Sequence, residues 1–380
     1  MVPRRLSIKK YEDPFLHSID DFIINISSIT NTFHALHSVI EKHVHASLEP
    51  LKKRFPEAFA DKKVGDTVTL KAGDTAEHRF FVHNVILKAD SLAASYYNFP
   101  MAYAIVLKSF LDNLFSDLIR IYLVETPTKL KAFNKEIKYS EVLDASSIEE
   151  LKNKLIEEVV LGFTRKSHIE MIKFLEKEFD LTDLRESLPN FSDFDEFCQR
   201  RNLLTHNNSK PNEEYSKKYF ENDNNPEYLV IERDYLFRQS YNILSIGVIT
   251  SFLVWRKIRK SDSRAVSQNI NEVGLSLLEN NFYQSAVDLF EFALKNKAIY
   301  KDGEFEFIFK LNLAQSYKRI DRMDSAASVI ESTNWDILAI QFRICKFSIE
   351  SNKKEMFRLM REAGQNCTIK LHDYLYWPIF

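Results

Sequence analysis

Glycine, proline and cysteine are all scarce in this sequence. Only seven glycines and ten prolines occur in 380 residues, a composition that disfavours β-hairpins and tight turns and favours long helices. The three cysteines, Cys198, Cys345 and Cys367, stand in no CxxC or zinc-type spacing, and their odd number does not suit a disulfide framework. We therefore expect the chain to work in a reducing cytoplasm.

The sequence also lacks an excess of one charge and a long apolar run. Its 52 basic and 54 acidic residues nearly cancel, so any site for a polyanion such as RNA must be local. The most apolar run, residues 241–255 (YNILSIGVITSFLVW), is shorter than the roughly 18 residues needed to cross a bilayer. No apolar stretch typical of a signal peptide follows the first residues. We expect no membrane partner.

Several catalytic motifs are missing. There is no GxxxxGKS/T, GxGxxG or HExxH pattern, and the glycines do not cluster, so the sequence holds no recognisable phosphate-binding loop. His34, His37, His43 and His45 lie close together, but no carboxylate or cysteine completes a metal-binding set beside them. We interpret them as surface histidines and expect neither a metal nor a cofactor.

Helical periodicity dominates the rest of the chain and predicts an all-α fold. Pro100 should open a new helix, Ser147 should begin another with a capping box, and Ser192 should cap the segment SDFDEFCQRRNLLTH. A polar link that contains the strand-like VGDTVTL (residues 64–70) precedes the second helix. The expected helices span about 15–44, 77–95, 100–125, 148–160, 166–178, 192–206 and 233–258.

A different pattern follows a charged hinge at Arg256–Arg264. Small and large apolar residues alternate at matching positions in two segments. The first segment has Gly274, Leu277, Ala286 and Phe290, and the second has Ala314, Tyr317, Ala326 and Ile330 at the equivalent positions. This spacing resembles the tetratricopeptide repeat, and residues 335–363 would form a third, degenerate pair. Ordinary helical hairpins are the alternative. A repeat array implies a concave surface for a protein partner or trigger.

These patterns predict three parts. Residues 1–75 would form an N-terminal helical extension, residues 76–262 a helical bundle, and residues 263–380 a short α-solenoid of tetratricopeptide-like repeats. The bundle would carry the one segment with a chemical signature.

That segment is FSDFDEFCQRRNLLTHNN, residues 191–208. On a helix, Asp195, Gln199, Asn202 and His206 follow the spacing i, i+4, i+7, i+11 and share one stripe. An apolar face adjoins this stripe and comprises Phe191, Phe194, Phe197, Cys198 and Leu204. The same residues also have purely structural explanations: Asp195 could complete a capping box with Ser192, Arg200 and Arg201 could pair with Glu196, and His206 could cap the helix.

The run RRNLLTHNN resembles the Arg-polar-x3–x5-His motif of the HEPN-domain ribonucleases, and the order of helices over roughly residues 77–260 is also similar. The resemblance implies a helical bundle that cuts RNA without metal at a composite site in a homodimer. Carried over, Arg201 and His206 are the catalytic pair, Asn202 is the polar residue of the motif, and Asp195 matches an upstream acidic residue. Arg200 offers an alternative register.

Candidate substrate-binding residues surround the motif: Gln199 and Arg200 on the helix, and Asn207 and Lys210 in the loop that follows. We expect an endoribonuclease, either an anti-phage (abortive infection) or a toxin-like effector. Asn208 stands where the family's toxins often have a tyrosine, which argues against the modification seen there. The alternatives are a non-enzymatic dimeric scaffold, or an RNA- or nucleotide-binding module that has lost cutting.

Overall fold

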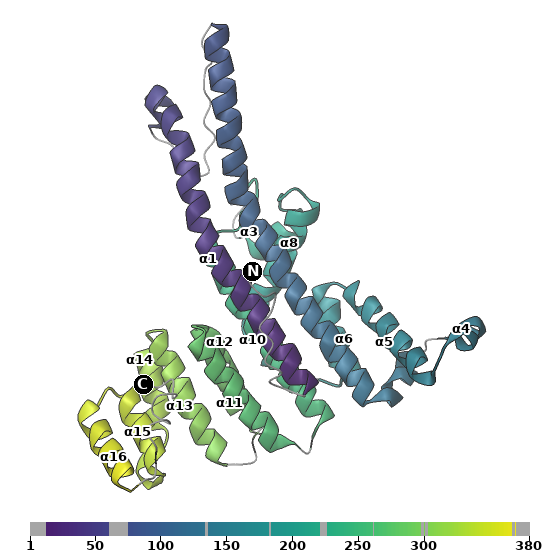
Figure 1. The fold of residues 1–380 in the computed structure, drawn as a ribbon, viewed down its shortest axis with the longest axis vertical. Coiled ribbons are helices and arrows are strands. Elements are labelled where there is room, and N and C mark those ends of the chain that lie inside the picture. The colour runs from purple at the N-terminus through teal and green to yellow at the C-terminus, as the bar shows by residue number, and fades with distance from the viewer. Residues whose placement is uncertain are drawn as a thin grey trace. The chain divides into compact units, whose positions relative to one another are not determined.

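The computed structural model describes residues 13–60, 75–133, 136–181, 184–220, 226–260, 262–297, 300, 303–366 and 369. Within these ranges every regular element is a helix (Figure 1), so the predicted all-α fold is confirmed. No helix in the same ranges combines the length and the apolar character that a membrane span requires. The strand-like residues 64–70 lie outside the described residues.

The helices before residue 260 include three long ones, α1, α3 and α10. The bounds are α1 (Pro14–Arg54), α2 (Pro56–Phe59), α3 (Ala76–Glu125), η1 (Pro127–Phe133), α4 (Tyr139–Asp144), α5 (Ile148–Thr164), α6 (His168–Glu178), α7 (Leu184–Ser187), α8 (Phe191–His206), α9 (Glu213–Tyr219) and α10 (Arg233–Ile258). Ser147 is the N-cap of α5 and accepts a hydrogen bond from the Glu150 amide, as predicted, but the capping box is not completed, because the Glu150 carboxylate accepts from Ser146. Helix α9 lies where the sequence predicted only a polar loop; Asn212 caps it.

The chain divides into two compact units. The first comprises residues 1–24, 110–195 and 241–380, and the second comprises residues 25–109 and 196–240. Helices α1, α3, α8 and α10 each contribute residues to both. The boundaries predicted near residues 75 and 262 differ from this division and stay predictions.

In the first unit, the core is organised around the buried second half of α10. Phe15 of α1 stacks on Trp255 of α10 with ring centroids 5.3 Å apart, and both are fully buried. The guanidinium of Arg259, just after α10, pairs with Asp13 and with both oxygens of Glu125. The predicted hinge at Arg256–Arg264 therefore contains a residue, Arg259, that is fixed by two carboxylates.

In the second unit, α1 and α3 pack through aromatic rings. Phe33 of α1 contacts Phe99 and Tyr103 of α3 at centroid distances of 5.6 and 5.1 Å. These contacts lie on both sides of Pro100, and α3 continues through that proline, so the predicted helix start there is wrong. Proline removes one backbone hydrogen bond, and here packing on both flanks holds the helix together.

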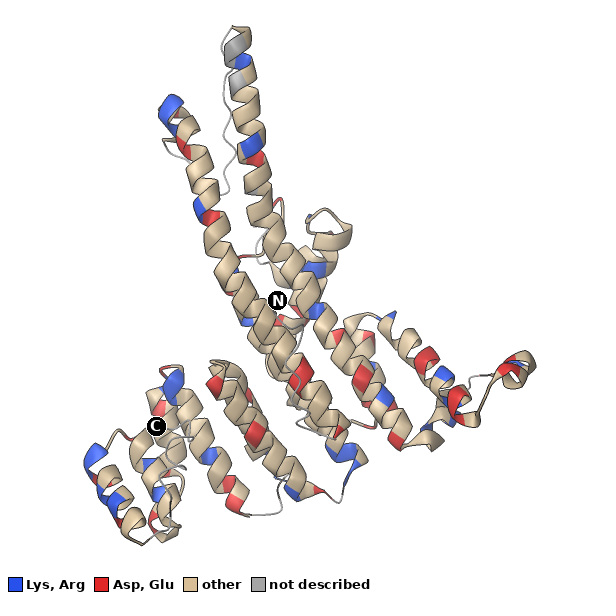
Figure 2. Ribbon diagram, viewed as in Figure 1, with Lys and Arg blue, Asp and Glu red and all other residues tan. Residues whose placement is uncertain are grey.

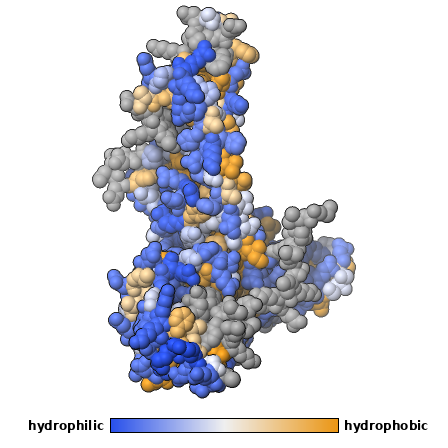
Figure 3. All heavy atoms as spheres, turned by 60° about the vertical axis from the view of Figure 1, so that its left-hand side comes forward, coloured by the Kyte–Doolittle hydropathy of each residue, from blue (hydrophilic) through white to orange (hydrophobic). Residues whose placement is uncertain are grey.

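Some apolar side chains of this helical pair face solvent. Leu36 and Val39 on α1, and Phe80 and Leu87 on α3, are exposed. In the upper part of Figure 3 apolar patches are scattered among hydrophilic side chains.

Three consecutive helical hairpins complete the first unit: α11 (Ser263–Glu279) with α12 (Tyr283–Lys295), α13 (Gly303–Arg319) with α14 (Met323–Glu331), and α15 (Ile340–Ile349) with α16 (Lys353–Gln365). A short helix, η2 (Trp335–Ile337), precedes the third. A Cβ atom on Gly274 would lie 2.2 Å from the ring of Phe290, so only glycine permits this close approach of α11 and α12. The hairpins that the spacing of small residues predicted are thus observed.

The three hairpins turn in the same way. Asn281, Asp321 and Ser351 each have a left-handed backbone, with φ of 63°, 60° and 59°. The amide of the following residue donates in each case to the carbonyl five residues back: Phe282 to Leu277, Arg322 to Tyr317, and Asn352 to Phe347. This is the 6→1 hydrogen bond of a Schellman motif. The shared turn supports the interpretation of the segment as a repeat.

Candidate active site

Helix α8, which carries the motif, begins at Phe191, one residue before the predicted cap. Asn190 has a φ of 45°, and its carbonyl accepts hydrogen bonds from the amides of Asp193 and Phe194. Ser192 is therefore inside the helix, and the prediction that it caps α8 is wrong. Phe194, Phe197, Cys198 and Leu204 are buried, while Phe191 is half-buried.

Asp195 lies at the end of the part of α8 that belongs to the first unit. Its Oδ1 is 2.6 Å from Nε2 of His168, the first residue of α6, and the two side chains are 8% and 3% exposed. A buried carboxylate and imidazole at this distance form a strong, charge-assisted contact when the histidine is protonated. Asp195 is thus paired with a histidine that the sequence analysis did not single out, and not with Ser192.

The next residue, Glu196, is the centre of a polar cluster in the second unit. Its carboxylate accepts hydrogen bonds from Arg200 Nε at 2.7 Å, from the Tyr235 hydroxyl at 2.6 Å and from the Tyr215 hydroxyl. Arg200 also donates from Nη1 to the Val230 carbonyl at 3.0 Å and lies 4.4 Å above the Tyr235 ring. Burial raises the pKa of both tyrosines, so both remain hydrogen-bond donors at neutral pH. Arg200 is committed to this cluster.

Arg201 has different surroundings. It is half-buried, and its Nη1 donates to Oδ1 of the neighbouring Asn202 at 3.1 Å. Its Nε is buried and has no hydrogen-bond partner among the described residues. An unsatisfied buried guanidinium nitrogen costs about 1–3 kcal/mol, so the hydrogen-bonding capacity of Arg201 is not fully used within the described chain.

His206 is the last residue of α8 and is exposed. The chain leaves the helix through two successive left-handed residues, Asn208 and Ser209, with φ of 47° and 63°. The Ser209 amide donates to the Leu203 carbonyl, which closes the helix end. This tight exit leaves His206 on the surface beside a short, ordered loop.

The remaining candidates flank the motif. Gln199 is half-buried on α8, and Asn207 and Lys210 are exposed in the loop. The Asn207 amide donates from Nδ2 to the Lys210 carbonyl at 2.7 Å, and the Lys210 ammonium lies 5.3 Å above the Tyr228 ring. The side chains of Asn207 and Lys210 therefore both make contacts within this region, and both residues are still exposed to solvent.

Helical geometry decides how these residues face. At 100° per residue, His206 lies about 40° around the helix from Asn202 and about 140° from Arg201. The bond to Asn202 draws the Arg201 guanidinium toward the Asn202–His206 face. One chain thus presents a histidine, an amide and one edge of a guanidinium from α8.

No group of three or more His, Cys, Asp or Glu side chains with metal-binding geometry occurs among the residues that the structure describes. His34, His43 and His45 are exposed, as predicted, and Nδ1 of His34 lies 3.3 Å from Nη2 of Arg233. His37 is buried against the rings of Phe33 and Tyr96, so its interpretation as a surface histidine is wrong.

The chain matches no family model, no curated protein and no solved structure. The resemblance to HEPN ribonucleases therefore rests on the motif and on the order of helices alone.

Proposed function

We propose that the protein is a metal-independent RNA endonuclease of the HEPN type, with Arg201 and His206 as its catalytic pair. The observation that carries the proposal is the unpartnered Nε of Arg201 beside Asn202, one helical turn from the exposed His206. Arg201 and Asn202 are half-buried and bond to each other, and His206 is exposed.

RNA supplies its own nucleophile in this proposal. His206 accepts the proton of a 2′-hydroxyl, whose oxygen attacks the adjacent phosphorus while the bond to the 5′-oxygen breaks. The planar guanidinium of Arg201 binds two phosphate oxygens and stabilises the charge that grows on them in the transition state. Asn202 holds the guanidinium in place. The products are a 2′,3′-cyclic phosphate and a 5′-hydroxyl, and DNA is not cut.

A second histidine is needed to protonate the leaving 5′-oxygen. A homodimer that brings two copies of the motif together would supply one base and one acid from identical chains, as the family resemblance implies. The 140° between the helix positions of Arg201 and His206 supports this arrangement, because the two side chains leave α8 in different directions.

The test is cleavage of total cellular RNA by the full-length protein in EDTA. We expect cutting by the wild type and a loss of about 10²–10⁴-fold in His206→Ala, the range associated with a general acid or base. Because His206 is exposed, the variant should melt at the wild-type temperature. A wild type that cuts nothing, or cutting that requires added magnesium or manganese, would contradict the proposal.

The biological setting we propose is host defence, as an abortive-infection or toxin-like effector in which the C-terminal hairpins hold or release the nuclease. This step is an analogy to the family. It predicts that expression of the wild type arrests growth and that expression of His206→Ala does not.

A second candidate is a non-enzymatic dimeric scaffold. Asp195 and Arg200 favour it, because the structure uses both side chains in internal contacts with His168 and with Glu196. In that case purified protein would be dimeric by light scattering and inert toward RNA, and His206→Ala would change neither property.

A further inference from the structure

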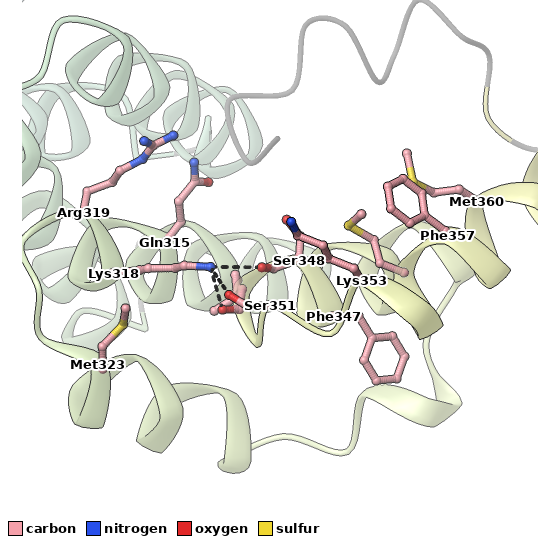
Figure 4. Close-up of a pocket in the computed structure, with 12 residues that line it drawn as sticks. Gln315, Lys318, Arg319, Met323, Phe347, Ser348, Ser351, Lys353, Phe357 and Met360 are labelled. Atoms are coloured by element: carbon pink, nitrogen blue, oxygen red, sulfur yellow. Dashed lines mark hydrogen bonds between the residues drawn. The ribbon is translucent and has the colours of Figure 1, made fainter.

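A groove of about 590 Å³ opens between the second and third hairpins of the first unit, at the end where both hairpins turn. Helices α13, α14, α15 and α16 and the turn at Ser351 line it (Figure 4). We call it the basic groove. It uses none of the residues of α8, and its volume lies within the range of sites that bind ligands, about 300–1,000 Å³.

The walls of the basic groove are apolar and partly open to solvent. Met323, Phe347, Met356, Phe357 and Met360 line them, and Met323 and Phe357 are 55% and 53% exposed. Methionine is unbranched and polarisable, so surfaces rich in it adapt to different apolar side chains. Large apolar side chains left in solvent around a concave surface indicate a binding surface.

Every charged residue that lines the groove is basic. Lys318 is fixed in the wall, because its ammonium donates to the carbonyls of Ser348 and Ile349 and to the Ser351 hydroxyl at 2.9–3.1 Å (Figure 4). Arg319 and Lys353 are exposed and form no salt bridge with a described carboxylate, and the Arg319 guanidinium lies 6.0 Å from the centre of the Tyr283 ring.

Basic residues recur along α16 (Figure 2), and one that does not line the groove, Arg358, pairs with Glu355 and Glu362. Arg319 and Lys353 at the groove are therefore not neutralised by carboxylates, whereas Arg358 is. A ligand that carries carboxylates would supply it.

We propose that the basic groove binds an acidic amphipathic segment of a partner protein. Leucine, isoleucine, phenylalanine or methionine side chains of the segment pack on the methionine-rich walls, and its Asp or Glu side chains pair with Arg319 and Lys353. RNA fits this surface less well, because a track of phosphates requires a continuous run of cations, and here the walls between the cations are apolar. The inference does not depend on RNA cleavage.

The experiment selects 12-residue peptides from a phage-displayed library on the immobilised full-length protein. We expect the enriched peptides to combine acidic residues with large aliphatic or aromatic ones. A synthetic peptide of the enriched sequence should bind the double variant Arg319→Glu, Lys353→Glu about tenfold or more weakly than wild type, and added salt should weaken its binding.

Arg361→Glu is the matched control, since Arg361 is an exposed basic residue of the same helix that does not line the groove. It should bind the peptide as wild type does. Three results would overturn the proposal: no enrichment, enriched peptides without acidic residues, or equal affinity for wild type and the double variant. RNA cleavage is measured in a separate assay, so failure of peptide binding and failure of the proposed nuclease activity can be told apart.

Discussion

Arg200 and Arg201 are neighbours in the chain, yet their guanidinium groups have opposite roles in the structure. Arg200 donates from Nε to the Glu196 carboxylate at 2.7 Å and from Nη1 to the Val230 carbonyl, whereas Nε of Arg201 is buried without a partner among the described residues. Within the proposed ribonuclease, this difference supports Arg201 over Arg200 as the arginine that binds phosphate.

Arg201→Lys should reduce RNA cleavage about 10²–10³-fold, nearly as much as Arg201→Ala, as expected for loss of one transition-state donor. Lysine keeps the charge but not the planar grip on two phosphate oxygens. Single-turnover cleavage at saturating protein measures the effect. A lysine variant that cuts at the wild-type rate would show that Arg201 acts only as a charge.

Arg200→Ala is the matched control and should behave in the opposite way. Glu196 would lose its cationic partner but keep the Tyr215 and Tyr235 hydroxyls, so we expect a loss of about 2 kcal/mol in the free energy of unfolding. Cleavage per folded molecule should stay within a few-fold of wild type. Denaturant unfolding together with the cleavage assay separates the two effects.

Asp288→Asn should stabilise the protein at neutral pH. Asp288 is half-buried on α12 between Ser245 and Gln284, which donate to its oxygens at 2.7 and 2.9 Å, and its partial burial raises its pKa above the ordinary 3.8. As pH rises, Asp288 loses its proton at a lower pH in the unfolded chain than in the folded protein. The free energy of unfolding therefore falls between pH 3.8 and the raised pKa, and the loss is complete above that pKa.

The difference in unfolding free energy between Asp288→Asn and wild type should therefore be small at acidic pH and grow to a plateau toward pH 7. Urea unfolding at a series of pH values gives this difference directly. A difference that shrinks as pH rises would mean that Asp288 is stabilised as the carboxylate.

Asp321→Gly should raise stability by about 0.5–1 kcal/mol, because glycine adopts the left-handed backbone of this turn without strain. Ser351→Gly should gain less, since it removes the hydroxyl that accepts from Lys318. Thermal unfolding of both variants tests this order. Destabilisation by Asp321→Gly would show that its side chain holds the turn.

A chain that ends near Lys260 tests the predicted boundary at residue 262. The structure gives a reason to expect aggregation or a lower melting temperature, because Tyr241 and Ser245 of α10 bind Ser285 and Asp288 of α12, and Tyr241 packs on Phe282. A soluble, folded fragment would instead establish the bundle and the repeats as separate domains.

The sequence predicted the elements whose signals are local. The helix expected over residues 233–258 has these bounds in the structure, and the small residue at Gly274 accommodates Phe290 as the repeat spacing requires. The prediction of a helix start at Pro100 was wrong. Proline favours a helix start locally, but α3 continues through Pro100, where Phe99 packs on Phe33 of α1.

The candidate site was predicted only in part, for a related reason. Asp195 pairs with His168, which lies 27 residues earlier in the chain. Arg200 binds Glu196 together with two tyrosines, Tyr215 and Tyr235, which follow Arg200 by 15 and 35 residues. Helical spacing places residues on a face but does not reveal which distant side chains meet them. The catalytic roles of Arg201, Asn202 and His206 stay predictions.

The three equivalent left-handed turns have a consequence for how this chain tolerates changes in length. Asn281 and Asp321 are 40 residues apart, and Asp321 and Ser351 are 30 apart, while the turn itself is the same each time. Added or lost residues must then lie in the helices or in the connections between hairpins. A reporter peptide inserted at Ile337, which is 79% exposed in such a connection, should leave the protein folded, whereas the same insertion beside Asp321 should not.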